Sequence, residues 1–118
     1  MAQQGEYKDL LVTLADHVAT VEIRRPPHNY FDHALIAQLS DAFDAMSASA
    51  DCRAIVLASE GKSFCAGANF ATNPDIVNAP RKPGVVEKPL YKEAARLFRN
   101  RKPVIAAVHG PAVGGGLG

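Results

Sequence analysis

The sequence predicts an α/β protein built around a parallel sheet, and two observations carry this prediction. Apolar segments rich in β-branched residues precede and follow a segment with helical periodicity, which is the order of a strand–helix–strand unit. Residues 54–58 and 104–108 are apolar without interruption, as expected for strands that are covered on both faces. A length of 118 residues fits a single domain.

The first elements are predicted to form an antiparallel hairpin. Residues 10–14 and 18–23 are rich in β-branched side chains, and Asp16 and His17 lie between them. The run Arg24-Arg25-Pro26-Pro27 ends the second strand because proline has no N–H group for the strand ladder. A short loop follows, from residue 28 to residue 31.

The next element is a helix that begins after Asp32, whose side chain is suited to an N-cap. Phe31 precedes it and can pack on Ile36 as a hydrophobic staple. Apolar residues at helical spacing predict a helix that runs to about residue 50. These residues are Leu35, Ile36, Leu39, Ala42, Phe43 and Met46.

A strand at 54–58, a second helix and a strand at 104–108 complete the predicted order. The loop between about residues 71 and 88 is long, and loops of this length are usually functional or mobile. Pro89 suits the first turn of the second helix. The apolar face of that helix is expected to contain Leu90, Ala94, Leu97 and Phe98. Positive charge near its C-terminal end is favoured by the helix dipole, and Arg99, Arg101 and Lys102 lie there.

Small residues follow both predicted parallel strands, at 65–68 and at 114–116. Ligands bind at the carboxyl ends of strands in open α/β sheets, so one N–H group from each segment could converge on one oxygen. If the glycine run opens a helix, the positive end of the helix dipole would favour a negative charge there. Small residues also serve tight turns and close packing, so the pattern alone leaves both interpretations open.

Other chemistries have weaker support. A phosphate-binding loop would need a completed G-x-G-x-x-G or a G-x-x-x-x-G-K-[ST] motif, and the sequence contains neither. Cys65 has no assigned base and fits a packed thiol better than a nucleophile. The four histidines lack metal-ligand spacing, so no metal site is expected.

The bulk properties favour a cytoplasmic protein. A net charge of +1 favours neither nucleic acid nor an acidic partner, and no run approaches the ~20 apolar residues of a membrane span. Two cysteines without C-x-x-C spacing fit a reducing compartment, and the polar N-terminal residues do not resemble a signal segment.

Two segments, 63–69 and 102–118, together resemble the crotonase (enoyl-CoA hydratase/isomerase) superfamily. Ser-Phe-Cys-Ala-Gly-Ala-Asn matches the F-x-A-G-A-D signature, with Asn69 where Asp is usual. Lys-Pro-Val-Ile-Ala-Ala-Val-His-Gly-Pro-Ala-Val-Gly-Gly-Gly matches the K-P-x-I-A-A-v-x-G-x-A-x-G-G-G signature. The resemblance implies the ββα spiral fold of crotonases, with residues 1–118 as the N-terminal part of one domain. It also implies a homotrimer or hexamer when full length.

The resemblance further implies an acyl-CoA-processing enzyme of the enoyl-CoA hydratase/isomerase type. The thioester oxygen would accept hydrogen bonds from the backbone N–H groups of Ala68 and Gly115, which form an oxyanion hole. Ala66, Asn69 and Phe70 would line the CoA path, and Arg25 and His28 would also touch CoA. Coenzyme A belongs to the substrate, so no resident cofactor is implied.

Gly118 departs from the family pattern, because hydratases with two catalytic glutamates carry the first Glu at this position. The second acid/base position would lie after residue 118. The residues present therefore do not support hydration by paired carboxylates, and the reaction class stays open. One alternative is a non-catalytic protein that binds CoA esters or packs against subunits, and another is a nucleotide-binding α/β domain. The chain is expected to be part of a longer polypeptide, an expectation that an intact mass of 12.6 kDa would refute.

Overall fold

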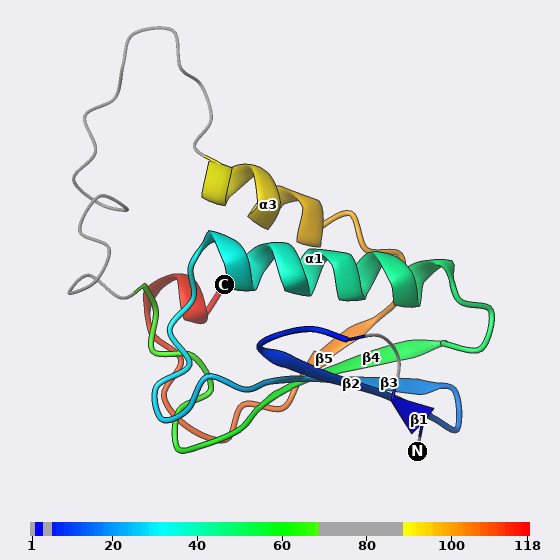
Figure 1. Cartoon of the computed structure of the whole chain (residues 1–118), viewed down its shortest axis with the longest axis horizontal. Helices are drawn as coiled ribbons and strands as arrows, with labels where there is room; N and C mark the ends of the chain where they lie inside the picture. The colour runs from blue at the N-terminus through cyan, green and yellow to red at the C-terminus, as the bar shows by residue number, and fades with distance from the viewer. Residues whose placement is uncertain (1, 4–5, 69–88) are drawn as a thin grey trace, which may run out of the picture.

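The computed structural model describes residues 2–3, 6–68 and 89–118, and within them the strands form one mixed sheet (Figure 1). In sheet order the strands are β1 (Ala2–Gln3), β2 (Leu10–Ala15), β3 (Val18–Ile23), β4 (Ala54–Ser59) and β5 (Val104–Ala106). Helix α1 (His33–Ala48) lies over one face of the sheet, and α3 (Pro89–Leu97) lies on the outer side of α1. A 3-10 turn, η1 (Gly114–Gly116), lies near the N-terminal end of α1. Among these residues, no helix combines the length and apolar character needed to cross a bilayer.

The predicted hairpin is confirmed. Strands β2 and β3 are antiparallel, with Ala15 opposite Val18. The two turn residues between them, Asp16 and His17, have φ angles of 51° and 68°. Positive φ at both central residues is the geometry of a type I′ turn, one of the two favoured two-residue hairpin turns. Strand β1, which pairs antiparallel with β2, was not predicted, because two residues carry no recognisable strand pattern.

The predicted parallel sheet is confirmed for the last three strands. Strand β3 pairs parallel with β4, in a register that runs from Val18 opposite Ala54 to Ile23 opposite Ser59. Strand β4 pairs parallel with β5, with Ile55 opposite Val104. The carboxyl ends of β3, β4 and β5 therefore lie at the same edge of the sheet.

Both ends of α1 are held by side chains. The carboxylate of Asp32 accepts a hydrogen bond from the N–H of Leu35 at 2.9 Å, which confirms the predicted N-cap. The helix ends at Ala48, two residues before the predicted end. Lys102 Nζ donates to the carbonyl oxygens of Ser49, at 2.9 Å, and Cys52. Lys102 was predicted to lie at the C-terminal end of the second helix, whereas its ammonium group donates to carbonyl oxygens that follow α1.

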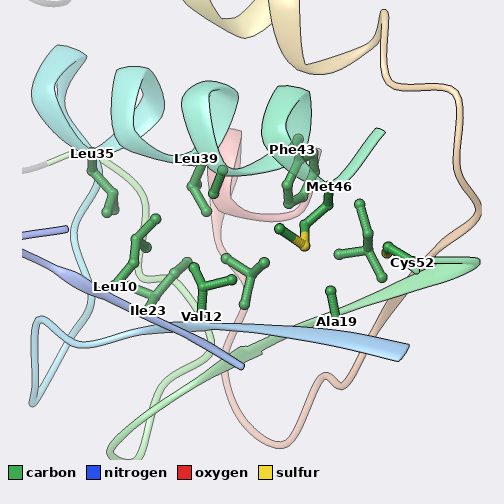
Figure 2. Packing of buried hydrophobic residues seen from close by; sticks show 12 residues of the cluster. Leu10, Val12, Ala19, Ile23, Leu35, Leu39, Phe43, Met46 and Cys52 are labelled. Atoms are coloured by element: carbon green, nitrogen blue, oxygen red, sulfur yellow. The ribbon is translucent and has the colours of Figure 1, made fainter. Parts of the chain in front are cut away.

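One face of α1 and the sheet form the hydrophobic core. Figure 2 shows Leu35, Leu39, Phe43 and Met46 of α1 directed toward the strands, where their neighbours include Leu10, Val12 and Ile23. These side chains are all buried. Two positions differ from the predicted face: Ile36 is only partly buried, and Ser40 is fully buried. The Ser40 hydroxyl donates to the carbonyl oxygen of Glu93, which joins α1 to α3.

The predicted burial holds only in part for β4 and is wrong for β5. The segment predicted at 104–108 forms a strand only as far as Ala106, and all three residues of β5 are exposed. In β4, Ile55 is the only residue that is fully buried. Helix α1 covers β2 and β3, while β5 lies at the end of the strand order and pairs only with β4 among the described residues. The apolar residues of this segment predicted a buried strand, but the described elements do not cover it.

The second helix packs on α1 mainly through polar groups. Its predicted start at Pro89 is confirmed, but its predicted apolar face is partly wrong. Leu97 packs against the core, whereas Phe98 follows the end of α3 and is 80% exposed. Arg96 forms ion pairs with Asp41 and Asp44 of α1, which compensates for the short apolar stripe. The predicted long loop at 71–88 lies outside the described residues.

Candidate functional site

Three loops meet at the carboxyl edge of the parallel strands, after β3 (24–31), after β4 (60–68) and after β5 (107–113). The second and third loops are joined by backbone hydrogen bonds. The N–H groups of Phe64 and Cys65 donate to the carbonyl oxygen of Pro111 at 3.0 and 3.1 Å. In return, the N–H of Val113 donates to the carbonyl oxygen of Cys65 at 2.9 Å. The two segments of small residues that the sequence analysis selected therefore lie side by side.

The first loop pairs with the other side of the second loop. The N–H of Ala66 donates to the carbonyl oxygen of His28, and the N–H of Phe31 donates to the carbonyl oxygen of Gly67, each at 3.0 Å. An isolated parallel bridge joins Phe31 to Ala68. The second loop thus lies between the other two, held on both sides by main-chain hydrogen bonds.

Close backbone approach explains two of the glycines. Gly67 has a φ of +92°, and a Cβ there would lie 3.0 Å from the carbonyl oxygen of Val113. A Cβ on Gly116 would lie 2.4 Å from the carbonyl oxygen of Cys65. Side chains at these positions would separate the loops, so the packing interpretation of the small residues holds for both glycines.

In η1 the N–H of Gly115 differs from those of the two residues that follow it, and the N–H of Ala68, in the second loop, resembles that of Gly115. In η1, the N–H of Gly116 donates to Val113, and the N–H of Leu117 donates to Gly114. Among the hydrogen bonds between described residues, none is donated by the backbone of Ala68 or Gly115. The glycine run that was predicted to open a helix forms a 3-10 turn over Gly114–Gly116, and Gly115 lies inside this turn.

Asn29 was not selected from the sequence, although it connects the first loop to the second. It is fully buried and has a φ of 53°. Its Oδ1 accepts from the N–H of Arg25 at 2.9 Å. Its Nδ2 donates to the carbonyl oxygens of Glu60 and Ser63 at 2.6 and 2.7 Å. An Asn in a turn after two prolines was a signal for positive φ, but its distant carbonyl partners were not readable.

The Arg25 guanidinium forms ion pairs with the carboxylates of Asp9 and Asp32. It donates to Asp9 Oδ2 at 2.9 Å and lies 3.0 Å from Asp32 Oδ1, at the N-cap of α1. Burial acts to raise the pKa of Asp9, but hydrogen bonds from Arg25 and Gln38 and the charge of Arg25 outweigh it and lower that pKa. Burial likewise acts to lower the pKa of Arg25, and its carboxylate partners raise it overall. A contact between Arg25 and CoA stays a prediction.

The other predicted CoA contacts are placed as follows. His28 is exposed, and its ring centroid lies 5.3 Å from that of Tyr30. Ala66 is partly buried between the first and third loops. Asn69 and Phe70 lie outside the described residues. The loops bring Ala66 and His28 together through a main-chain hydrogen bond, and their contact with a ligand stays a prediction.

Cys65 is a buried thiol inside the site. Burial raises its pKa, although hydrogen bonds from the backbone of Gly67 and Phe31 act in the opposite direction. A raised pKa keeps the thiol neutral, which agrees with the packed-thiol interpretation. Within residues 2–3, 6–68 and 89–118, no three His, Cys, Asp or Glu side chains are grouped to hold a metal ion.

Comparison with known proteins identifies the family. Residues 13–118 match the family model described as enoyl-CoA hydratase/isomerase, and the chain belongs to this family. The predicted resemblance to crotonases is therefore confirmed.

One relative is human and is named "Delta(3,5)-Delta(2,4)-dienoyl-CoA isomerase, mitochondrial". It is 33% identical to this chain over 127 aligned positions, which cover 98% of this chain and 39% of the human protein. Two solved structures show the same fold. The enoyl-CoA hydratase from Shewanella pealeana superposes with a TM-score of 0.77 at 28% identity, covering 92% of this chain and 42% of that one. The enoyl-CoA hydratase/isomerase from Pseudoalteromonas atlantica gives a TM-score of 0.74 at 29% identity, with coverage of 93% and 42%.

The chain spans about two-fifths of the length of these relatives. The structure accordingly confirms the predicted α/β class and the match to crotonase-fold proteins over this part of their length.

Proposed function

We propose that these residues form the thioester-binding part of an acyl-CoA-processing enzyme of the enoyl-CoA hydratase/isomerase type. One observation carries the proposal: hydrogen bonds between Cys65, Pro111 and Val113 hold the two small-residue segments side by side. Ala68 and Gly115 follow these hydrogen-bonded residues within three positions, and neither N–H donates to another described residue. Family membership supports the substrate class.

In the proposed mechanism, the N–H groups of Ala68 and Gly115 donate to the thioester carbonyl oxygen. Negative charge builds on this oxygen when an α-proton leaves or a nucleophile adds at the β-carbon, and the hydrogen bonds strengthen as it builds. Both segments are fixed by backbone pairing, so little reorganisation is needed during the reaction. A single donor of this kind contributes on the order of a hundred- to a thousandfold in rate.

The proposed substrate is an acyl-CoA thioester, and coenzyme A enters as part of it rather than as a resident cofactor. The carboxyl edge where the three loops meet supplies the carbonyl-binding groups. The proton-transferring group must come from elsewhere, since residue 118 is glycine. Similar proteins carry the names of a dienoyl-CoA isomerase and of enoyl-CoA hydratases, and both names specify a CoA thioester. The proposed assembly is a homotrimer or hexamer.

The test measures turnover of two substrates by the polypeptide that carries these residues. The absorbance of the conjugated enoyl thioester follows both reactions. Crotonyl-CoA loses this absorbance on hydration, and a 3-enoyl-CoA gains it when the double bond shifts. We expect turnover of at least one substrate. Gly115→Pro removes one donor and, like Gly115→Ala, brings a Cβ against the ring of Phe31. Its turnover should fall by about a hundredfold or more, well below that of Gly115→Ala, while a non-reactive acyl-CoA analogue still binds. Unchanged turnover in this variant would refute the role of that N–H group.

A second candidate function, binding of CoA esters without turnover, is favoured by Gly118 in place of a carboxylate. Calorimetric titration with the non-reactive analogue distinguishes the two candidates. Binding without turnover of either substrate supports the second function. If free ATP binds in the same titration and the acyl-CoA analogue does not, the result would instead favour a nucleotide-binding domain.

A further inference from the structure

The side chain of Asn29 binds main-chain groups on both sides of the loop junction. It accepts from the N–H of Arg25 and donates to the carbonyl oxygens of Glu60 and Ser63. Its three hydrogen-bonding partners therefore belong to two different loops. The side chain is 0% exposed, so water does not replace any of these bonds.

The residues that flank Asn29 pair with the segment that leads to Ala68. The carbonyl oxygen of His28 accepts from the N–H of Ala66, and the N–H of Phe31 donates to the carbonyl oxygen of Gly67. The ring of Phe31 also lies against Gly115, where a Cβ would come within 2.5 Å of Cζ. The position of residue 29 thus influences the surroundings of both proposed donors.

We propose that Asn29 is a positioning residue that sets the separation and direction of the Ala68 and Gly115 N–H groups. The inference rests on the proposed function, because it concerns the same oxyanion site. Asn29 acts through the backbone of His28 and Phe31 and does not touch the reacting atoms. It couples the loop after β3 to the loop after β4, and the ring of Phe31 extends this coupling to the glycine run.

Asparagine is suited to this position for two reasons. A φ of 53° lies in the left-handed region, which Asn adopts more readily than most residues. Its amide offers one acceptor oxygen and two donor hydrogens, which match one N–H and two carbonyl groups. Aspartate keeps the shape, the backbone preference and the acceptor, but it places an oxygen against two carbonyl oxygens. Glycine keeps the backbone preference and removes the side chain altogether.

The experiment compares Asn29→Asp and Asn29→Gly with the wild-type polypeptide. Ser40→Ala is the matched control, since Ser40 is also 0% exposed and also donates to a distant carbonyl, that of Glu93. The first readout is amide hydrogen exchange at Phe31 and Ala66. The amide of Ile55, which is 0% exposed and donates to the carbonyl oxygen of Pro103, reports global opening. The second readout is kcat and KM with the enoyl-CoA substrate.

We expect the Phe31 and Ala66 amides to exchange about tenfold faster in both Asn29 variants, with no matching change at Ile55. We expect kcat to fall by about ten- to a hundredfold with little change in KM, because misplaced donors chiefly affect the transition state. Ser40→Ala should lose stability and keep its kcat.

Wild-type exchange rates at Phe31 and Ala66 in both Asn29 variants would overturn the inference, and so would a kcat within twofold of wild type. If the wild-type polypeptide turns over neither enoyl-CoA substrate, the proposed function fails instead. The exchange measurement still decides whether Asn29 holds the loops, so the two failures are distinguishable.

Discussion

The aromatic ring of Phe31 lies against the backbone of Gly115, so that a methyl group on Gly115 would come within 2.5 Å of the ring's Cζ and 2.7 Å of its Cε1. The backbone of Phe31 is held in turn, because its N–H donates to the carbonyl oxygen of Gly67. One residue, placed just before the N-cap of α1, therefore contacts both segments that carry the proposed donors. The start of α1 forms part of the site although it supplies no reacting group.

A double-mutant cycle on this contact is the first prediction. Gly115→Ala keeps the N–H but forces the ring or the turn to move, so we expect kcat to fall by about tenfold or more. Phe31→Leu removes the ring atoms that the new methyl group would meet, and alone it should cost about 1 kcal/mol of stability. The double variant should recover much of the lost kcat, measured on the enoyl-CoA substrate. A double variant as impaired as Gly115→Ala would show that the clash with the ring is not the cause.

The second prediction concerns Asp9 and acid stability. The pKa of Asp9 is lower in the folded chain than its ordinary value of 3.8, so the ionised carboxylate stabilises the fold above that pH. This contribution is lost as the pH falls through the folded-state pKa. Asp9→Asn should therefore lower the free energy of unfolding by about 1–3 kcal/mol at neutral pH, and the difference from wild type should shrink near pH ~2. Urea unfolding at both pH values measures it.

Glu22 provides the control for Asp9, because it pairs with Arg24 on an exposed surface at 2.6 Å. Glu22→Gln should change the free energy of unfolding by less than about 1 kcal/mol. Equal effects of the two substitutions would contradict the special contribution of the part-buried Asp9–Arg25 pair.

The third prediction concerns the attachment of α3 to α1. Arg96 pairs with Asp41, Asp44 and Glu93, and these carboxylates raise its pKa further above its ordinary value. The groups are partly exposed, so Arg96→Met should cost only about 1 kcal/mol, part of it from repulsion among the carboxylates left behind. Adding about 1 M NaCl should remove most of the difference. Urea unfolding at low and high salt tests this, with Arg99→Met, at an exposed position, as the control. If salt leaves the loss in the free energy of unfolding unchanged, the cause is lost packing instead.

The fourth prediction concerns Lys102, whose ammonium group donates to the carbonyl oxygens of Ser49 and Cys52. Lys102→Met keeps an unbranched chain of similar length and removes both hydrogen bonds, so we expect a loss of about 1–3 kcal/mol in the free energy of unfolding. Arg101→Met replaces an exposed neighbour and should stay within about 0.5 kcal/mol of wild type. If both variants have the same free energy of unfolding, Lys102 contributes charge rather than specific hydrogen bonds.

Local signals in the sequence predicted much of the fold. The hairpin around Asp16 and the N-cap at Asp32 depend on a few neighbouring residues, and both predictions are confirmed. The periodicity of α1 identified most of its buried face, and the alternation of strands and helices gave the parallel order of β3, β4 and β5. The close approach of the segments at 65–68 and 114–116 also followed from topology, because the loops after parallel strands share an edge.

Properties that depend on distant neighbours were not readable. The apolar run at 104–108 predicted a buried strand, but burial depends on what covers the sheet, and α1 packs mainly over β2 and β3. Lys102 follows α3 in the sequence, yet its ammonium group donates to the carbonyl oxygen of Ser49 at the end of α1. Asn29 shows the same limit within the site, because its carbonyl partners lie more than thirty positions away. Side-chain types indicate what a residue can bind, and the tertiary fold decides which group it meets.

The exposed edge of the sheet has a practical consequence for material made from these residues alone. Ile105 of β5 is 63% exposed, and the strand has no described partner on its outer side. An apolar strand with free N–H and carbonyl groups recruits strands from neighbouring molecules, which leads to concentration-dependent aggregation. Ile105→Lys should delay the onset of light scattering in concentrated samples, because a charged side chain on an edge strand opposes such stacking.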